Sequence, residues 1–172
     1  MNLSNITKAE KEELFNSLIN PLKIKLYKTG MSILKNDDDV CDAVQNTMFS
    51  AYRNFEKLEN EKFFSTWITR IMINNCYDII KNNKKISYLN EKMEKEDGFY
   101  YDTYKEESKV EKALNSIDED LRMVALLYYY DGFPVKEISK ICDIPEGTVK
   151  SRLSRCRERL YILLKEEGDN NE

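Results

Sequence analysis

The chain has no histidine, and its four cysteines stand singly at positions 41, 76, 142 and 156 of 172 residues. Without histidine or a C-x-x-C pair, we expect neither a structural zinc site nor a Ser-His or Cys-His nucleophile pair. No two acidic residues stand apart from the other charges as a candidate acid–base pair. The sequence therefore predicts no catalytic residues, no bound metal and no cofactor. We expect all four cysteines to be buried small hydrophobic residues, because each lies in a segment of helical apolar periodicity.

Glycine and long apolar stretches are also scarce. Five glycines leave little room for a Gly-rich phosphate loop, and we predict no small-molecule substrate. The longest apolar runs, such as 124–130, fall far short of the ~20 residues that a membrane-spanning helix needs. The first residues lack the basic start and apolar stretch of a secretion signal. We therefore expect a cytoplasmic protein.

The net charge of −4 is spread unevenly along the chain. Residues 1–90 hold 13 Lys and Arg against 11 Asp and Glu, whereas residues 91–120 hold 5 against 11. Within 145–165 the count is 6 basic against 2 acidic residues. The acidic average therefore does not exclude nucleic-acid binding by the basic segment.

The first half of the chain has apolar residues at helical spacing from Glu10 to about Asn83. A first helix ends before Pro21, a second ends near Asn36, and Asp37-Asp38-Asp39 supplies the N-cap of a third. A fourth helix is predicted from Phe64 to Lys81, after the polar stretch 56–62. Its apolar side is predicted to contain Trp67, Ile68, Ile71, Tyr77 and Ile80.

Residues 84–108 lack clear periodicity and are rich in acids, which is typical of an extended or weakly ordered linker. Helical spacing resumes at Lys109 and continues to Glu167. In this part a short helix, a tight connection at Asp143-Ile144-Pro145 and a basic last helix form a helix-turn-helix. The sequence thus predicts an all-α protein. Two small helical domains, 8–84 and 109–167, are joined by a flexible acidic linker, 85–108.

The last helix has the pattern of a DNA-reading helix. Its buried stripe is predicted to contain Val149, Leu153, Cys156 and Leu160. The helix start is small and polar, which suits close approach to phosphate, and Arg155 can contact guanine with two hydrogen bonds. Beside the stripe lie Arg152 and Arg159, and on the outer side lie Thr148, Lys150, Ser151, Ser154 and Arg155.

Three motifs together resemble the extracytoplasmic-function (ECF) sigma factors of bacterial RNA polymerase. The last two helices match the promoter-reading region four, written "EIA…GTVKSRLxRAR…L", with Ser139 and Cys156 where alanine is usual. Residues 42–52 resemble the region-two signature "D-x-V-Q-E-x-F-x-x-A-(W/Y)", with Asn46 in place of glutamate. Residues 63–74 resemble "F-x-x-W-L-x-R-I-A-x-N". The resemblance covers nearly the whole chain, in the order and at the spacing of the family.

The resemblance implies a site for each motif. Thr148, Lys150, Ser151, Arg152, Ser154 and Arg155 would contact the minus-thirty-five element. Phe64, Trp67, Arg70, Asn74 and Lys81 would contact the minus-ten element, beside a loop at residues 56–64 that captures a flipped base. Asp42, Gln45 and Asn46 would bind core polymerase. From the residues alone, Trp67 is interpreted first as a core residue that anchors the fourth helix, and Phe63 and Phe64 as packing residues of which one is exposed.

The implied partners are core RNA polymerase, through its clamp helices and flap, and promoter DNA in duplex and single-stranded form. An anti-sigma factor, often membrane-anchored in the family, would hold the protein inactive. The acidic linker would thread the nucleic-acid channel of polymerase or act as a passive spacer, and the sequence does not separate these roles. The alternative function is a dimeric helix-turn-helix regulator that acts without core polymerase. Such a regulator has no need of the two motifs in the first half.

Overall fold

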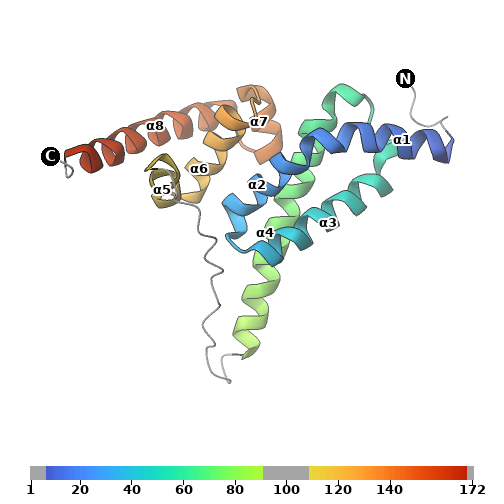
Figure 1. Ribbon diagram of the computed structural model, residues 1–172, viewed down its shortest axis with the longest axis horizontal. Coiled ribbons are helices and arrows are strands. Elements are labelled where there is room, and N and C mark those ends of the chain that lie inside the picture. The colour runs from blue at the N-terminus through green and yellow to red at the C-terminus, as the bar shows by residue number, and fades with distance from the viewer. Residues whose placement is uncertain (1–6, 91–108, 170–172) are drawn as a thin grey trace. The chain divides into compact units, whose positions relative to one another are not determined.

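The computed structural model describes residues 7–90 and 109–169 of the chain (Figure 1). Within these two ranges the regular structure is helical and contains no strand, which confirms the predicted all-α fold. The chain divides into two compact units, Met1–Lys95 and Glu96–Glu172. None of the described helices is long and apolar enough to cross a membrane.

Within residues 7–90, the first unit contains four α-helices: α1 (Lys8–Ile19), α2 (Lys23–Leu34), α3 (Asp37–Arg53) and α4 (Phe64–Asn90). A capping box starts α1, because the Thr7 side chain accepts a hydrogen bond from the Glu10 amide and the Glu10 carboxylate accepts one from the Thr7 amide. Pro21 lies in a 3-10 turn, Asn20–Leu22, where the predicted break between the first two helices occurs.

The N-cap of α3 is Asn36, which directly precedes the predicted run Asp37-Asp38-Asp39. The Asn36 side chain accepts a hydrogen bond from the Asp39 amide at 2.9 Å. The three aspartates that follow lie inside the first turn, where their negative charge interacts favourably with the helix dipole. The prediction placed the cap in this run and not at Asn36 because asparagine and aspartate are about equally good caps.

The core of the first unit is formed where α2, α3 and α4 pack together. Gly30 of α2 permits this packing, because a Cβ atom there would lie 2.5 Å from Met72 Cε and 3.0 Å from Val40 Cγ1. At Gly30, α2 therefore packs closely against both α3 and α4. The largest fully buried side chains in this unit include Ile19, Leu26, Val40, Phe55, Phe64, Ile68 and Met72.

Helix α4 is longer than predicted, because it continues past Lys81 to Asn90. Residues 85–90, which were predicted to belong to the linker, are therefore helical. The remaining part of the predicted linker, 91–108, lies outside the described residues. The apolar side of α4 is also shifted, because Ile68, Met72, Ile73 and Cys76 are buried whereas Tyr77 is 40% exposed. The prediction of Tyr77 on the buried side was wrong.

The second unit contains α5 (Lys109–Ser116), α6 (Glu119–Ala125), α7 (Val135–Cys142) and α8 (Glu146–Asp169). A short π-helical turn, Leu126–Tyr130, continues α6. The buried residues Ile117, Leu121, Ala125 and Cys156 pack together, with Leu160 and Leu163 against them. This unit therefore has a hydrophobic cluster of its own.

The four cysteines are free thiols in different surroundings. Cys76 and Cys156 are buried, and Cys142 is partly buried. Burial raises the pKa of the Cys142 thiol to about 11. Cys41 is exposed, so the expectation that all four cysteines are buried was wrong. It lies on α3 next to the buried Val40, and apolar periodicity near a residue does not determine on which side of the helix that residue lies.

Candidate nucleic-acid interface

The helix-turn-helix is formed by α7, a tight turn and α8. Asp143 ends α7 in the left-handed conformation with φ 54°, and the Ile144 amide donates a hydrogen bond to the Ser139 carbonyl at 3.1 Å. The Ser139 hydroxyl donates to the Ile144 carbonyl at 2.6 Å. Pro145 precedes α8, and its carbonyl accepts a hydrogen bond from the Thr148 amide at 2.9 Å. These bonds fix the direction in which α8 leaves the turn.

The buried and exposed sides of α8 divide as its sequence predicts. Val149, Leu153 and Cys156 are buried, and Leu160 is partly buried. The outer side carries two basic and two hydroxyl side chains, with Thr148 half-buried beside them. This side can meet both phosphates and base edges. The exposed residues are Lys150, Ser151, Ser154 and Arg155.

Two arginines of α8 are paired with acidic residues at the start of α6. Arg152 forms an ion pair with Asp120, and Arg159 Nη1 lies 3.0 Å from Asp118 Oδ2. The Arg152 side chain is half-buried. Arg152 was predicted to contact DNA, but in the free chain its guanidinium is bound within the same unit. The spacing of residues along α8 could not predict the partners Asp118 and Asp120, because both lie over 30 residues away in the sequence.

A second polar surface follows the length of α4. Arg70, Asn74 and Lys81 are exposed, and Tyr77 lies on the same side of the helix. The combination of cation, amide and aromatic ring suits a single nucleic-acid strand, because phosphates attract the cations and bases stack on the ring. Tyr77 is the member of this group that the sequence interpretation missed.

Phe64 is buried and cannot present its ring to DNA. Its exposure is 2%, and it packs among Phe15, Phe55 and Trp67. The predicted contact of Phe64 with the minus-ten element is therefore wrong. Its neighbour Phe63, which is 51% exposed, ends the 3-10 turn before α4. The spacing of Phe64, Ile68 and Met72 at intervals of four would have indicated a buried position.

Trp67 lies between the aromatic core and the surface of α4. It is partly buried, and the centroid of its ring is 6.0 Å from that of Phe64. Both interpretations of Trp67 from sequence thus retain a basis, since the ring packs against the core and also has an accessible part.

The outer side of α3 forms a third surface in the first unit. Asp42, Gln45 and Asn46 are exposed there, and Phe49 is 69% exposed one turn further along. A large aromatic side chain with this exposure beside polar groups is typical of a protein-binding surface. Phe49 is within the quoted motif, but the sequence interpretation did not select it. In residues 7–90 and 109–169, no three His, Cys, Asp or Glu residues group in a way that could hold a metal ion.

Comparisons with known proteins find sigma-70 family models that match both units. Residues 18–86 match the family model "Sigma-70 region 2", and residues 107–160 match "Sigma-70, region 4". The chain is 32% identical to the ECF RNA polymerase sigma-E factor of Escherichia coli K12 over 137 residues, which cover 71% of this chain and 72% of that protein. It is 28% identical to the ECF RNA polymerase sigma factor SigW of Bacillus subtilis, over 90% of this chain and 91% of the relative.

Two solved structures have the same fold. One is the sigma factor RpoE in complex with the anti-sigma factor NepR from Bartonella quintana. It has a TM-score of 0.73 and 26% identity, with 92% of this chain and 98% of that chain covered. The other is CnrH in complex with the cytosolic domain of CnrY. It has a TM-score of 0.64 and 20% identity, with 95% and 92% covered.

Proposed function

Because the chain belongs to the ECF RNA polymerase sigma factors, which direct transcription initiation from particular promoters, we propose that its two units divide promoter recognition between them. The first unit, about 8–84, binds core polymerase and holds the melted minus-ten element. The second unit, about 109–167, reads the minus-thirty-five element. The observation that carries this proposal is the outer side of α8, where two cations and two hydroxyls are exposed opposite a buried apolar stripe.

In the second unit, Lys150, Ser151 and Arg155 of α8 would enter the major groove, with Thr148 and Ser154 beside them. Arg155 has the geometry to bond a guanine edge, while Lys150 and the hydroxyls reach phosphates or bases. Arg152 reaches DNA only by leaving Asp120, and we propose that it orients α8 in the free chain.

In the first unit, we propose that Arg70, Asn74, Tyr77 and Lys81 of α4 bind the non-template strand, with Trp67 at the edge of that surface. The amide of Asn74 can both donate to and accept from a base edge. Promoter melting needs no nucleotide hydrolysis by this chain, because binding of the unstacked strand offsets the cost of opening the duplex. The chain would thus be a non-catalytic specificity subunit of polymerase.

The outer side of α3, with Asp42, Gln45, Asn46 and Phe49, is the proposed contact with the clamp helices of core polymerase. The second unit would contact the flap. We further propose a cytoplasmic location, where polymerase and promoters are present. An anti-sigma factor is a proposed partner because the RpoE neighbour was solved in complex with one.

Run-off transcription tests the function directly. Purified core polymerase is supplied with linear DNA from upstream of the gene that encodes this chain, with and without the protein. We expect a discrete transcript only when the protein is present, without any ATP-driven activator. If core polymerase stays silent while the protein alone protects duplex DNA, the chain acts as a helix-turn-helix regulator and the proposal fails.

A further inference from the structure

The loop between α3 and α4, residues 54–63, is held from one side by α1. Its first part is a 3-10 turn, Phe55–Lys57, and its last part is a second such turn, Glu61–Phe63. Phe55 and Leu58 are buried, whereas Glu59, Asn60, Lys62 and Phe63 are exposed. The loop thus has an anchored base and an exposed tip.

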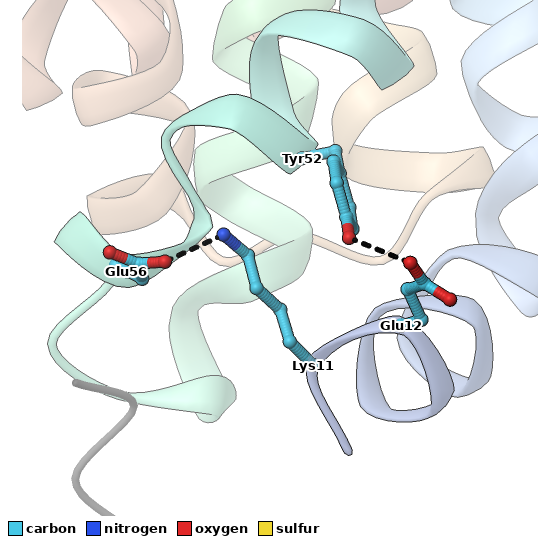
Figure 2. A network of polar contacts seen from close by, with 4 residues as sticks. All are labelled: Lys11, Glu12, Tyr52 and Glu56. Carbon is cyan, nitrogen blue, oxygen red and sulfur yellow. Dashed lines mark hydrogen bonds and ion pairs between the residues drawn. The ribbon is translucent and has the colours of Figure 1, made fainter. Parts of the chain in front are cut away.

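An ion pair connects α1 to the anchored part of the loop (Figure 2). Lys11 Nζ lies 2.8 Å from Glu56 Oε1, and the Lys11 side chain is only 15% exposed. The hydrogen bond from Lys11 lowers the pKa of the Glu56 carboxyl, which favours its ionised form. The same ammonium lies 5.1 Å from the centre of the Tyr52 ring at the end of α3. The Tyr52 hydroxyl reaches the Glu12 carboxylate of α1 at 3.4 Å.

An aromatic contact one turn further along α1 reinforces the pair. Phe15, four residues after Lys11, has its ring centre 5.3 Å from that of Tyr52, 5.4 Å from Phe55 and 5.7 Å from Phe64. All three pairs have the edge-to-face geometry that aromatic rings prefer. Phe15 therefore touches the last turn of α3, the start of the loop and the start of α4. Positions four apart share one side of a helix, so Lys11 and Phe15 act on the loop together.

The two ends of the loop are tied by α1, whereas the side chains of its tip are exposed. A pocket that receives an unstacked base gains affinity when its backbone is ordered before binding, since no ordering entropy is then lost on capture. We propose that Lys11 and Phe15 of α1 are positioning residues that hold the α3–α4 loop in the shape that accepts a base of the minus-ten strand. This inference rests on the proposed function of the first unit.

The ion pair provides the sharper test, because it lies near the surface and can be removed without opening the core. The variants are Lys11→Met, Glu56→Gln, the two together, and the exchange Lys11→Glu with Glu56→Lys. Lys8→Met is the matched control, since it removes the same charge from an exposed position in the first turn of α1. Circular dichroism of each full-length variant checks that the helices are retained.

Two measurements distinguish the ordering of the loop in the free chain from its binding of the DNA strand. Amide hydrogen exchange of residues 54–63 in the free chain reports loop order without DNA. The run-off start site locates the minus-ten sequence. Strand capture is then measured as the affinity of the reconstituted holoenzyme for a single-stranded oligonucleotide with the non-template minus-ten sequence. We expect Lys11→Met and Glu56→Gln each to accelerate exchange and weaken oligonucleotide binding by roughly three- to fivefold, the scale of a partly exposed ion pair. Core-polymerase affinity should not change.

The double variant should be no worse than either single variant, and the exchange of charges should restore most of both signals. Additive effects, or loss with Lys11→Met and none with Glu56→Gln, would mean that the Lys11–Glu56 pair does not hold the loop, and the inference would fail. Unchanged exchange in every variant would also overturn it. If exchange accelerates while oligonucleotide binding stays constant, α1 positions the loop but the loop does not capture the strand, which refutes the proposed role of the loop.

Discussion

Single side chains in this chain differ in reactivity because their surroundings differ, and the cysteines illustrate this. Cys41 lies on the outer side of α3, one residue from the proposed polymerase contact Asp42, whereas Cys76 and Cys156 are enclosed by helices. Burial raises the pKa of Cys142 from 9.0 to about 11, which leaves roughly 100-fold less thiolate at neutral pH. Thiol chemistry of the folded protein should therefore be concentrated at Cys41.

A thiol reagent should modify one cysteine of the native protein quickly and the other three slowly. Cys41→Ser should remove the fast phase and leave the slow phases unchanged, as followed by the absorbance of the released chromophore. Modification of Cys41 by a bulky maleimide should also weaken core-polymerase binding, because the label lies beside Asp42 and Gln45. A fast phase that persists in Cys41→Ser would contradict the burial of the other three thiols.

Tyr27 of α2 should titrate at a higher pH than an ordinary tyrosine side chain. Its hydroxyl donates a hydrogen bond to the Asp37 carboxylate, which raises the pKa of Tyr27 to about 12. A raised pKa in the folded state gives stability that is complete below the ordinary value near 10 and is lost as pH rises through 12. Tyr27→Phe should remove a step near pH 12 from the tyrosinate absorbance titration. It should also make the free energy of unfolding less dependent on pH between 10 and 12.

The turn between α7 and α8 determines how the second of these helices is presented. Ser139, where the family usually has alanine, adds a side-chain hydrogen bond to the Ile144 carbonyl that alanine cannot make. The backbone bond between the same two residues remains with either side chain. The turn between α7 and α8 therefore does not depend on the Ser139 hydroxyl, which adds a further hydrogen bond to it.

Ser139→Ala should lower the free energy of unfolding of the second unit by about 1 kcal/mol, the usual net value of one hydrogen bond. Denaturant titration by circular dichroism measures this change. The contrasting variant is Asp143→Gly, which relieves a left-handed conformation at φ 54° and should stabilise the unit by about 0.5 kcal/mol. If both variants destabilise it equally, the turn geometry described above is incorrect.

The whole molecule consists of two compact units, each with buried apolar side chains of its own. Because Lys150 and Arg155 lie in one unit and Asp42 and Gln45 in the other, upstream recognition and polymerase binding should be separable by mutation. This separation is the central expectation of the proposed division between the units.

Lys150→Ala with Arg155→Ala should abolish recognition of the upstream element while core-polymerase binding stays at the wild-type level. Loss of one bidentate base contact and one phosphate contact should weaken promoter binding by about 2 kcal/mol or more. The matched control, Lys112→Ala with Lys165→Ala, removes two exposed lysines of the same unit away from the start of α8. Footprinting of the holoenzyme and a pull-down of core polymerase measure the two activities. Loss of core binding in the first variant would refute the division.

Periodicity predicted the helices well because burial of one side is what stabilises them. The stripe of Val149, Leu153 and Cys156 followed directly from spacing. Spacing failed where a contact depends on another helix or on a cap. It ended α4 at Lys81, whereas the helix continues to Asn90. The contact of Phe64 with DNA came from the family motif, and burial of Phe64 contradicts it. Spacing also could not reveal that Asp120 binds Arg152, because that pair exists only after α6 and α8 have packed.

The pairing of Arg152 and Arg159 with the aspartates of α6 has a consequence for how the protein searches a chromosome. These aspartates cancel two of the four net positive charges in residues 145–165. Each cation withheld from phosphate lowers the number of released counterions, and affinity for arbitrary DNA falls accordingly. Lys150 and Arg155, the proposed base-reading residues, stay exposed, so under the proposed function the ratio of promoter binding to background binding should rise. A specificity subunit that leaves the wrong sequence quickly spends more of its time at the right one.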